Sequence, residues 1–212
     1  TCALPISLSN TARTIYGNLT VPASGGTYTA GTTATTFGAT SGSISITTTG
    51  RLLDFPITFG SAASTATFTL SDNLNIGTKT VTLTNGTINF NSKTVTVGGI
   101  TVLTGTVTVN NLSTSVAITH TSGSLTLGTN TTTGAYTFTA GTLTLVTYTL
   151  TCPTFSSNNA NARTLAFGTG NIAVGATSSG GTLVDFTTIT NLTTSGTQVI
   201  NVNYAGATTG AV

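Results

Sequence analysis

A short repeat runs through the middle of the chain and limits the folds open to it. Four segments share the order Gly, Thr or Ser, apolar, polar, apolar, and they begin at Gly86, Gly105, Gly123 and Gly141. Successive glycines in this series are 19, 18 and 18 residues apart. A near-constant short period indicates one structural module stacked on the next. The repeat therefore predicts an array of stacked units.

The composition assigns those units to β structure. Threonine supplies 57 of the 212 residues, and its branched Cβ favours strands over helices. Only eight side chains are charged and glutamate is absent, whereas ordinary soluble domains are roughly 25% charged. Hydroxyl groups must therefore take over the solvation of the surface.

Strict alternation of apolar residues and threonine marks the individual strands. It is seen over residues 81–84 and 93–97, and a similar pattern recurs 55 residues later over 136–145 and 148–152. Because neighbouring side chains of a strand point to opposite faces, the apolar set should face the core and the threonines should face solvent. The residues expected to be buried are Ile88, Phe90, Val95, Val97, Leu125, Leu127, Phe138, Leu143, Leu145 and Leu150.

These patterns predict an all-β fold, a parallel β-solenoid (β-helix) with rungs of about 18 residues. The four repeat glycines should then lie in successive layers near one edge, at corners that need positive φ or close packing. An antiparallel β-sandwich is the alternative, with Asn85-Gly86 as a hairpin turn.

The chain divides into four regions by sequence. Residues 1–7 resemble a translated sequencing adapter, so we expect them to be a non-native artefact of a metagenomic reading frame. Residues 8–58 are interpreted as the end of a preceding repeat unit, 59–186 as the main solenoid unit, and 187–212 as the start of the next unit or C-terminal strands. A longer repeat supports this division, since Arg13 and Arg163 match each other, as do Asp54 and Asp185.

No catalytic, cofactor-binding or metal-binding residue is predicted, and no cofactor is expected. Asp54, Asp72 and Asp185 are the only carboxylates, and turn capping is their expected task. His120 is the only histidine and has no companion ligands nearby in sequence.

The remaining candidate residues have structural interpretations. We expect Arg13 and Arg163 to bond turn carbonyls, with Asp185 as the nearest formal partner of Arg163. Cys152 is expected to be a small buried hydrophobe rather than half of a bond to Cys2.

Charge and hydropathy exclude two classes of partner. The net charge is +2 and the five cations form no basic stripe, so we expect no nucleic acid. No apolar run approaches the roughly 20 residues that a membrane-spanning helix needs, so we expect no membrane partner.

Residues 154–168, with 184–186 and 201–204, resemble uncharacterised Thr/Gly-rich repeat proteins of aquatic bacteriophage virions. The resemblance implies a non-enzymatic structural or adhesive segment of a tail fibre or spike, or of a cell-surface adhesin. It implies an extracellular or virion-surface location, a homo-oligomer such as a trimer, and a host-surface glycan as partner.

Two other functions stay open at this stage. One is a polysaccharide-active β-helix enzyme, for which the pair of carboxylates that glycoside hydrolysis requires is not evident. The other is an ice-binding solenoid that uses Thr-x-Thr pairs, although the sequence spreads these pairs over several strands. They begin at Thr82, Thr106, Thr137, Thr142 and Thr149.

Overall fold

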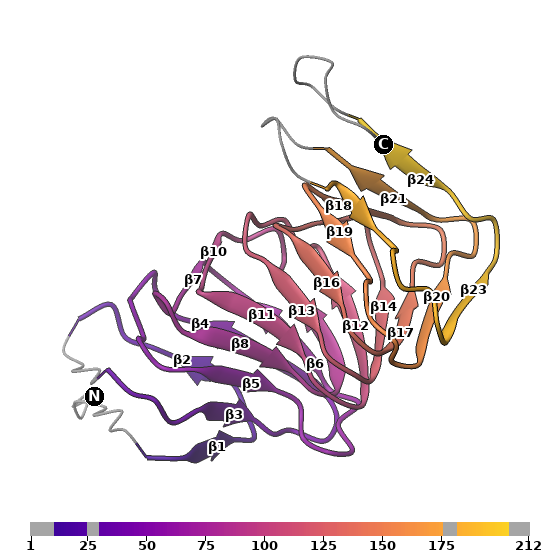
Figure 1. Cartoon of the computed structure of the whole chain (residues 1–212). Helices are drawn as coiled ribbons and strands as arrows, with labels where there is room; N and C mark the ends of the chain where they lie inside the picture. The colour runs from indigo at the N-terminus through magenta and orange to yellow at the C-terminus, as the bar shows by residue number, and fades with distance from the viewer. Residues whose placement is uncertain (1–10, 25–29, 176–181, 204–212) are drawn as a thin grey trace.

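Short alternating segments of the chain wind into a parallel β-solenoid in the computed structural model (Figure 1). The structure describes residues 11–24, 30–175 and 182–203. Every strand pairing within these residues is parallel, including those around Gly123 and Gly141. The solenoid prediction is therefore confirmed, and the antiparallel sandwich is wrong.

Two nine-stranded sheets, each taking one strand from every turn, form the long faces of the solenoid. Sheet 1 contains, in order, β1 (Arg13–Ile15), β3 (Thr35–Phe37), β5 (Ile57–Phe59), β8 (Thr80–Leu83), β11 (Gly99–Val102), β13 (Ile118–His120), β16 (Tyr136–Phe138), β19 (Phe155–Ser156) and β22 (Val184–Asp185). Sheet 2 contains β2 (Leu19–Thr20), β4 (Ser43–Thr47), β6 (Thr67–Leu70), β9 (Gly86–Asn89), β12 (Thr106–Asn110), β14 (Ser124–Leu127), β17 (Gly141–Thr144), β20 (Arg163–Ala166) and β23 (Leu192–Ser195).

The third face is interrupted. Its N-terminal part pairs β7 (Leu74–Asn75) with β10 (Val95–Thr96). Its C-terminal part contains β15 (Thr131–Thr132), β18 (Thr149–Cys152), β21 (Asn171–Val174) and β24 (Ile200–Val202). Between the two parts, only an isolated bridge from Ser113 to Thr132 extends the second one.

The core follows the alternation that the sequence predicts. All ten residues expected to be buried are buried, and none of them exceeds 8% exposure. The outward threonines beside them, such as Thr87, Thr142 and Thr144, are half-buried within their columns. Aromatic rings also stack between turns, as where Phe37 and Phe59 lie with ring centroids 5.3 Å apart.

The predicted rung length holds only in the middle of the molecule. Ile100, Ile118 and Tyr136 are register partners at intervals of 18 residues. Turns are longer towards both ends, with Ile57 opposite Val81 and Leu165 opposite Thr194. The extra residues lie in the connections, because the strands themselves stay two to five residues long.

The glycine column is correct for three of its four members. Gly105, Gly123 and Gly141 stack, each with positive φ. Gly86 pairs instead with Val107, two residues further along than expected. The corner before β9 is two residues shorter than the corner before β12, and an even shift keeps inward side chains inward.

Arg13 and Arg163 are not equivalent in the fold, since Arg13 lies in sheet 1 and Arg163 in sheet 2. Asp54 and Asp185 are not equivalent either. Both lie at sheet 1, but Asp54 precedes strand β5 whereas Asp185 lies within strand β22. The longer sequence repeat is therefore not a structural repeat at these positions.

Strand β5 of sheet 1 spans the boundary proposed at 58/59, and sheet 2 continues past the boundary proposed at 186/187 with β23. The expected artefact at residues 1–7, with Cys2, lies outside the described residues.

Candidate functional site

A single file of threonines covers the outer side of sheet 1. The register places one side chain of each turn directly above the next, at about the 4.8 Å spacing of neighbouring strands. The column consists of Thr14, Thr36, Thr58, Thr82, Thr101, Thr119 and Thr137. Stacked like residues of this kind each add a few tenths of a kcal/mol, so the column stabilises the turns and presents a row of hydroxyls.

Sheet 2 carries two such columns side by side. One contains Thr106, Ser124, Thr142 and Thr164, and the other contains Thr87, Thr108, Thr126 and Thr144. The sequence predicts that Thr-x-Thr pairs are spread over several strands, and the pairs on sheet 1 and on the third face are spread in this way. On sheet 2, however, the hydroxyl pairs of three successive turns stack directly above one another.

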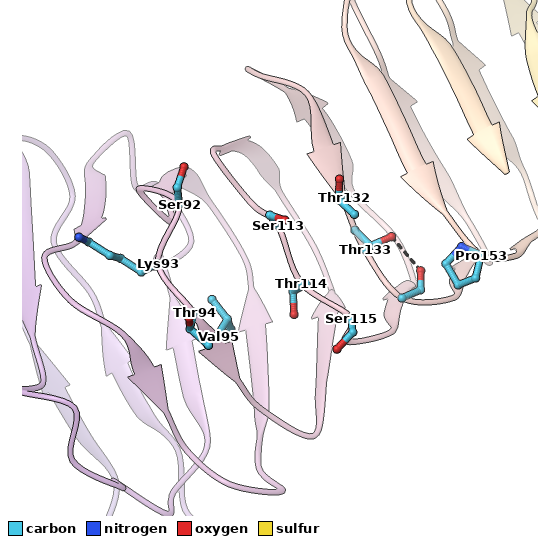
Figure 2. A pocket seen from close by; sticks show the side chains of 11 residues that line it. Ser92, Lys93, Thr94, Val95, Ser113, Thr114, Ser115, Thr132, Thr133 and Pro153 are labelled. Carbon is cyan, nitrogen blue, oxygen red and sulfur yellow. Dashed lines mark hydrogen bonds between the residues drawn. The ribbon is translucent and has the colours of Figure 1, made fainter. Parts of the chain in front are cut away.

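A groove crosses the third face where the sheet is interrupted (Figure 2). It has a volume of about 670 Å³ and is lined by residues 92–95, 113–115, 132–134 and Pro153. Most of these are serines and threonines, Lys93 is the one charged member, and none carries a carboxyl, imidazole or thiol group. Thr133 is buried and donates a hydrogen bond from its hydroxyl to the Gly134 carbonyl at 2.9 Å.

A change in turn length produces this groove. Asn89 partners Asn110 in sheet 2, and Ile100 partners Ile118 in sheet 1. The chain therefore crosses the third face with residues 90–99 in one turn and with only 111–117 in the next. The later segment is three residues shorter than the earlier one, and within the described residues β10 pairs only with β7. Sequence reasoning missed the groove, although this difference in spacing was its signal.

The three carboxylates have separate structural roles. Asp54 lies 3.7 Å from the Lys79 ammonium group. One Asp72 oxygen accepts a hydrogen bond from the Thr48 backbone N–H at 2.8 Å.

Asp185 is the third carboxylate, and it caps the turn that follows β22, as expected of it. It accepts from the Thr187 N–H at 3.0 Å, and that bond is the main cause of its lowered pKa. A side-chain amide of Asn158 also donates to it at 3.1 Å.

His120 faces the core rather than solvent. Its Nδ1 lies 3.2 Å from the Tyr136 hydroxyl, and its Nε2 lies 3.3 Å from the Gly123 carbonyl oxygen. A carbonyl can only accept, so Nε2 carries the proton and Nδ1 accepts from the tyrosine. Burial lowers the pKa of His120 to about 4, so the ring is neutral at physiological pH.

The other buried polar groups match their structural interpretation. Arg163 is 2% exposed and donates to the carbonyls of Thr188 and Thr190 at 3.1 and 3.0 Å, as expected of an arginine that bonds turn carbonyls. Its guanidinium bonds carbonyls and Ser157, and no ion pair to Asp185 is found in the described part of the chain. Cys152 is a free buried thiol whose pKa is raised to about 12 by burial.

Metal and membrane features are assessed over the described residues only. Within them, no three His, Cys, Asp or Glu side chains form a group that could hold a metal ion. Nor do they include a helix long and apolar enough to cross a bilayer. Comparisons with protein-family models, curated proteins and solved structures find no match to this chain.

Proposed function

We propose that this chain is a structural and adhesive segment of an extracellular fibre, of the kind found in phage tail fibres and spikes or in cell-surface adhesins, and that it works without catalysing a reaction. The observation that carries the proposal is the continuous parallel stack with its in-register columns of hydroxyls. Each turn is held to the next along two nine-stranded sheets, which suits a stiff spacer.

The surface chemistry supports the same role. Eight charged side chains leave the outer faces to threonine, which offers polar contacts without a strong field. The last turn also exposes apolar side chains, with Ile189 at 67% and Val202 at 46% exposure. A homo-oligomer, such as a trimer, would cover these exposed apolar side chains.

Sedimentation and electron microscopy of the purified chain test this proposal, together with incubation on a panel of polysaccharides. We expect elongated oligomers that resist proteolysis and release no new reducing ends. A compact monomer would overturn the proposed fibre role. Polysaccharide cleavage that is lost when Asp54, Asp72 or Asp185 is changed to Asn would overturn the proposed absence of catalysis.

A second candidate function is ice binding, which the paired columns of sheet 2 favour. Hydroxyls there repeat at about 4.8 Å between strands and about 6.6 Å along a strand, a regular two-dimensional array that could order water. Thermal hysteresis in a nanolitre osmometer tests it. Activity that is lost in Thr126→Lys but retained in Thr137→Lys, on the outer side of sheet 1, would support ice binding. Absence of hysteresis would exclude it.

A further inference from the structure

The groove on the third face lies where the solenoid changes its girth. Before the groove, successive turns cross from sheet 2 to sheet 1 with residues 70–80 and 90–99. After it, they cross with the shorter segments 111–117 and 129–135. We propose that the solenoid bends at this junction, so that the groove is a hinge that opens and closes. The inference goes beyond the proposed spacer function, because it places one joint within an otherwise stiff rod.

Two of the three faces pass through the junction without a break. In sheet 1, Ile100 pairs with Val81, and in sheet 2, Val109 pairs with Ile88. These two sheets meet at the corner that contains Gly105, on the side of the molecule away from the third face. Bending about this corner therefore keeps the main-chain bonds of both sheets and changes the separation of the turns on the third face.

The third face lacks main-chain ties along the groove. Within the described residues, no main-chain hydrogen bond joins 93–99 to 112–116. Such bonds are present at the neighbouring boundaries, from the Leu74 N–H to the Thr94 carbonyl at 2.9 Å and from the Thr114 N–H to the Thr132 carbonyl at 3.0 Å. Figure 1 shows the result as two separate groups of strands, β7 with β10, and β18 with β21 and β24. Because opening is easiest where the fewest bonds must break, this boundary resists bending least.

Main-chain groups on both sides of the groove can pair when it closes. The carbonyls on either side of Val95 accept bonds from β7, so alternation along the strand turns the N–H and C=O of Val95 towards the groove. Across the groove, the residues on either side of Ser113 bond Thr132, which turns the N–H and C=O of Ser113 towards the groove as well. These groups bond water when the groove is open and each other when it is closed. Such an exchange contributes little net free energy, so neither position is locked.

The interior beneath the groove is apolar. Val95 and Val97 are buried on one side of it and Leu112 on the other, in the same core cluster. Apolar contact has no preferred direction, so a small change of angle costs these side chains little. The core therefore holds the two parts of the solenoid together without fixing the angle between them.

Pulsed electron resonance with two matched pairs of spin labels tests the hinge. The first pair, Leu52 and Thr151, is exposed on the third face. The second pair, Thr36 and Thr137, lies on the outer side of sheet 1 in the same two turns. Each pair spans five layers and crosses the junction, so the pairs differ in the face that they report.

Labelled chains are diluted with unlabelled protein, so that each distance is measured within one chain. The distance distribution of the third-face pair should be at least about twice as broad as that of the sheet 1 pair, because sheet 1 is the continuous side of the hinge. Distributions of equal width would overturn the proposal.

A disulfide trap tests closure separately. Thr94 and Ser113 line opposite sides of the groove (Figure 2). In a variant with Thr94→Cys, Ser113→Cys and Cys2→Ser, oxidised glutathione should form this bond, because closure brings neighbouring strands to the Cα separation of about 5.5 Å that a disulfide needs. Cys152 is buried and should take no part.

Thr94→Cys with Thr132→Cys is the matched control, since Thr132 lies one turn beyond Ser113 and closure leaves it out of reach. Mass spectrometry counts the remaining thiols, and circular dichroism of each reduced variant verifies that the fold is retained. No disulfide in the Ser113 variant, or equal yields in the two variants, would overturn the hinge. Neither result would alter the oligomer shape or protease resistance that test the fibre function.

Discussion

At the scale of single residues, His120 and Tyr136 form a titratable, hydrogen-bonded pair in the interior. His120 occupies the column between Val102 and Phe138 and bonds Tyr136 of the next turn. It is held neutral because burial penalises its cation and because no carboxylate is bonded to it.

This pair makes the fold sensitive to acid. The folded-state pKa of His120 is about 4, below the ordinary 6.5. Between pH 6.5 and pH 4 the imidazole therefore takes up a proton in the unfolded chain but not in the folded one. Stability is therefore full above about pH 6.5 and declines as the pH falls towards 4, by about 2 kcal/mol at pH 4.5. Denaturant unfolding at pH 7 and pH 4.5 measures the loss.

A double variant, His120→Phe with Tyr136→Phe, is the control for this prediction, because it removes the imidazole together with the hydroxyl that would lose its acceptor. Since His120 is the only histidine, the decline between pH 6.5 and 4.5 should largely disappear. A decline of equal size in the double variant would show that another group is responsible.

Val146 is the clearest strained residue. Its φ is 61°, in the left-handed region that a β-branched side chain rarely adopts, and it is 41% exposed. Val146→Gly should raise the free energy of unfolding by about 0.5–1 kcal/mol, since relief of strain exceeds the extra entropy of glycine. Val146→Ala keeps the Cβ and should gain less. Equal gains in both variants would contradict the assignment to strain.

At the scale of elements, the corners between sheets 1 and 2 control the stacking. Gly123 has a φ of 75°, and a Cβ there would meet the Gly105 carbonyl oxygen at 2.8 Å. Gly42 has a φ of 86° and nothing within 4 Å of its would-be Cβ. Both positions therefore need a positive φ, but only Gly123 lacks room for a Cβ atom.

Gly123→Ala should accordingly destabilise the fold more than Gly42→Ala. The Gly42 variant pays about 1–2 kcal/mol for its backbone conformation alone, and the Gly123 variant should add to this at least about 1 kcal/mol because backbone must move. Thermal and denaturant unfolding measure both. Equal losses would mean that the corner column is not packed as described.

The elements also show where sequence reasoning is adequate. Alternation identifies Phe90 and Leu143 as inward because a strand of period two fixes that choice locally. The position of Gly86 and the groove depend on how many residues each connection takes between sheets. The lengths of the connections matter only when one turn is stacked on the next, and the repeat motif does not include them. Aligning the motifs therefore paired Gly86 with Gly105, two residues away from its actual partner Val107.

At the scale of the whole molecule, every turn adds one layer in register to sheet 1. Outward threonines separated by very different numbers of residues then lie at distances set only by the number of turns between them. Thr58 and Thr137 are four layers apart, as are Thr14 and Thr101, whereas Thr14 and Thr137 are six layers apart.

Distances between spin labels on these threonines, measured by pulsed electron resonance, test that claim most directly. Cys152 is buried with a pKa of about 12 and should stay unlabelled, and Cys2 is replaced by Ser. At about 4.8 Å per layer, the account predicts equal backbone separations of about 19 Å for the two four-layer pairs and about 29 Å for the six-layer pair. Unequal distances for the four-layer pairs, or a six-layer pair no further apart than they are, would contradict the solenoid.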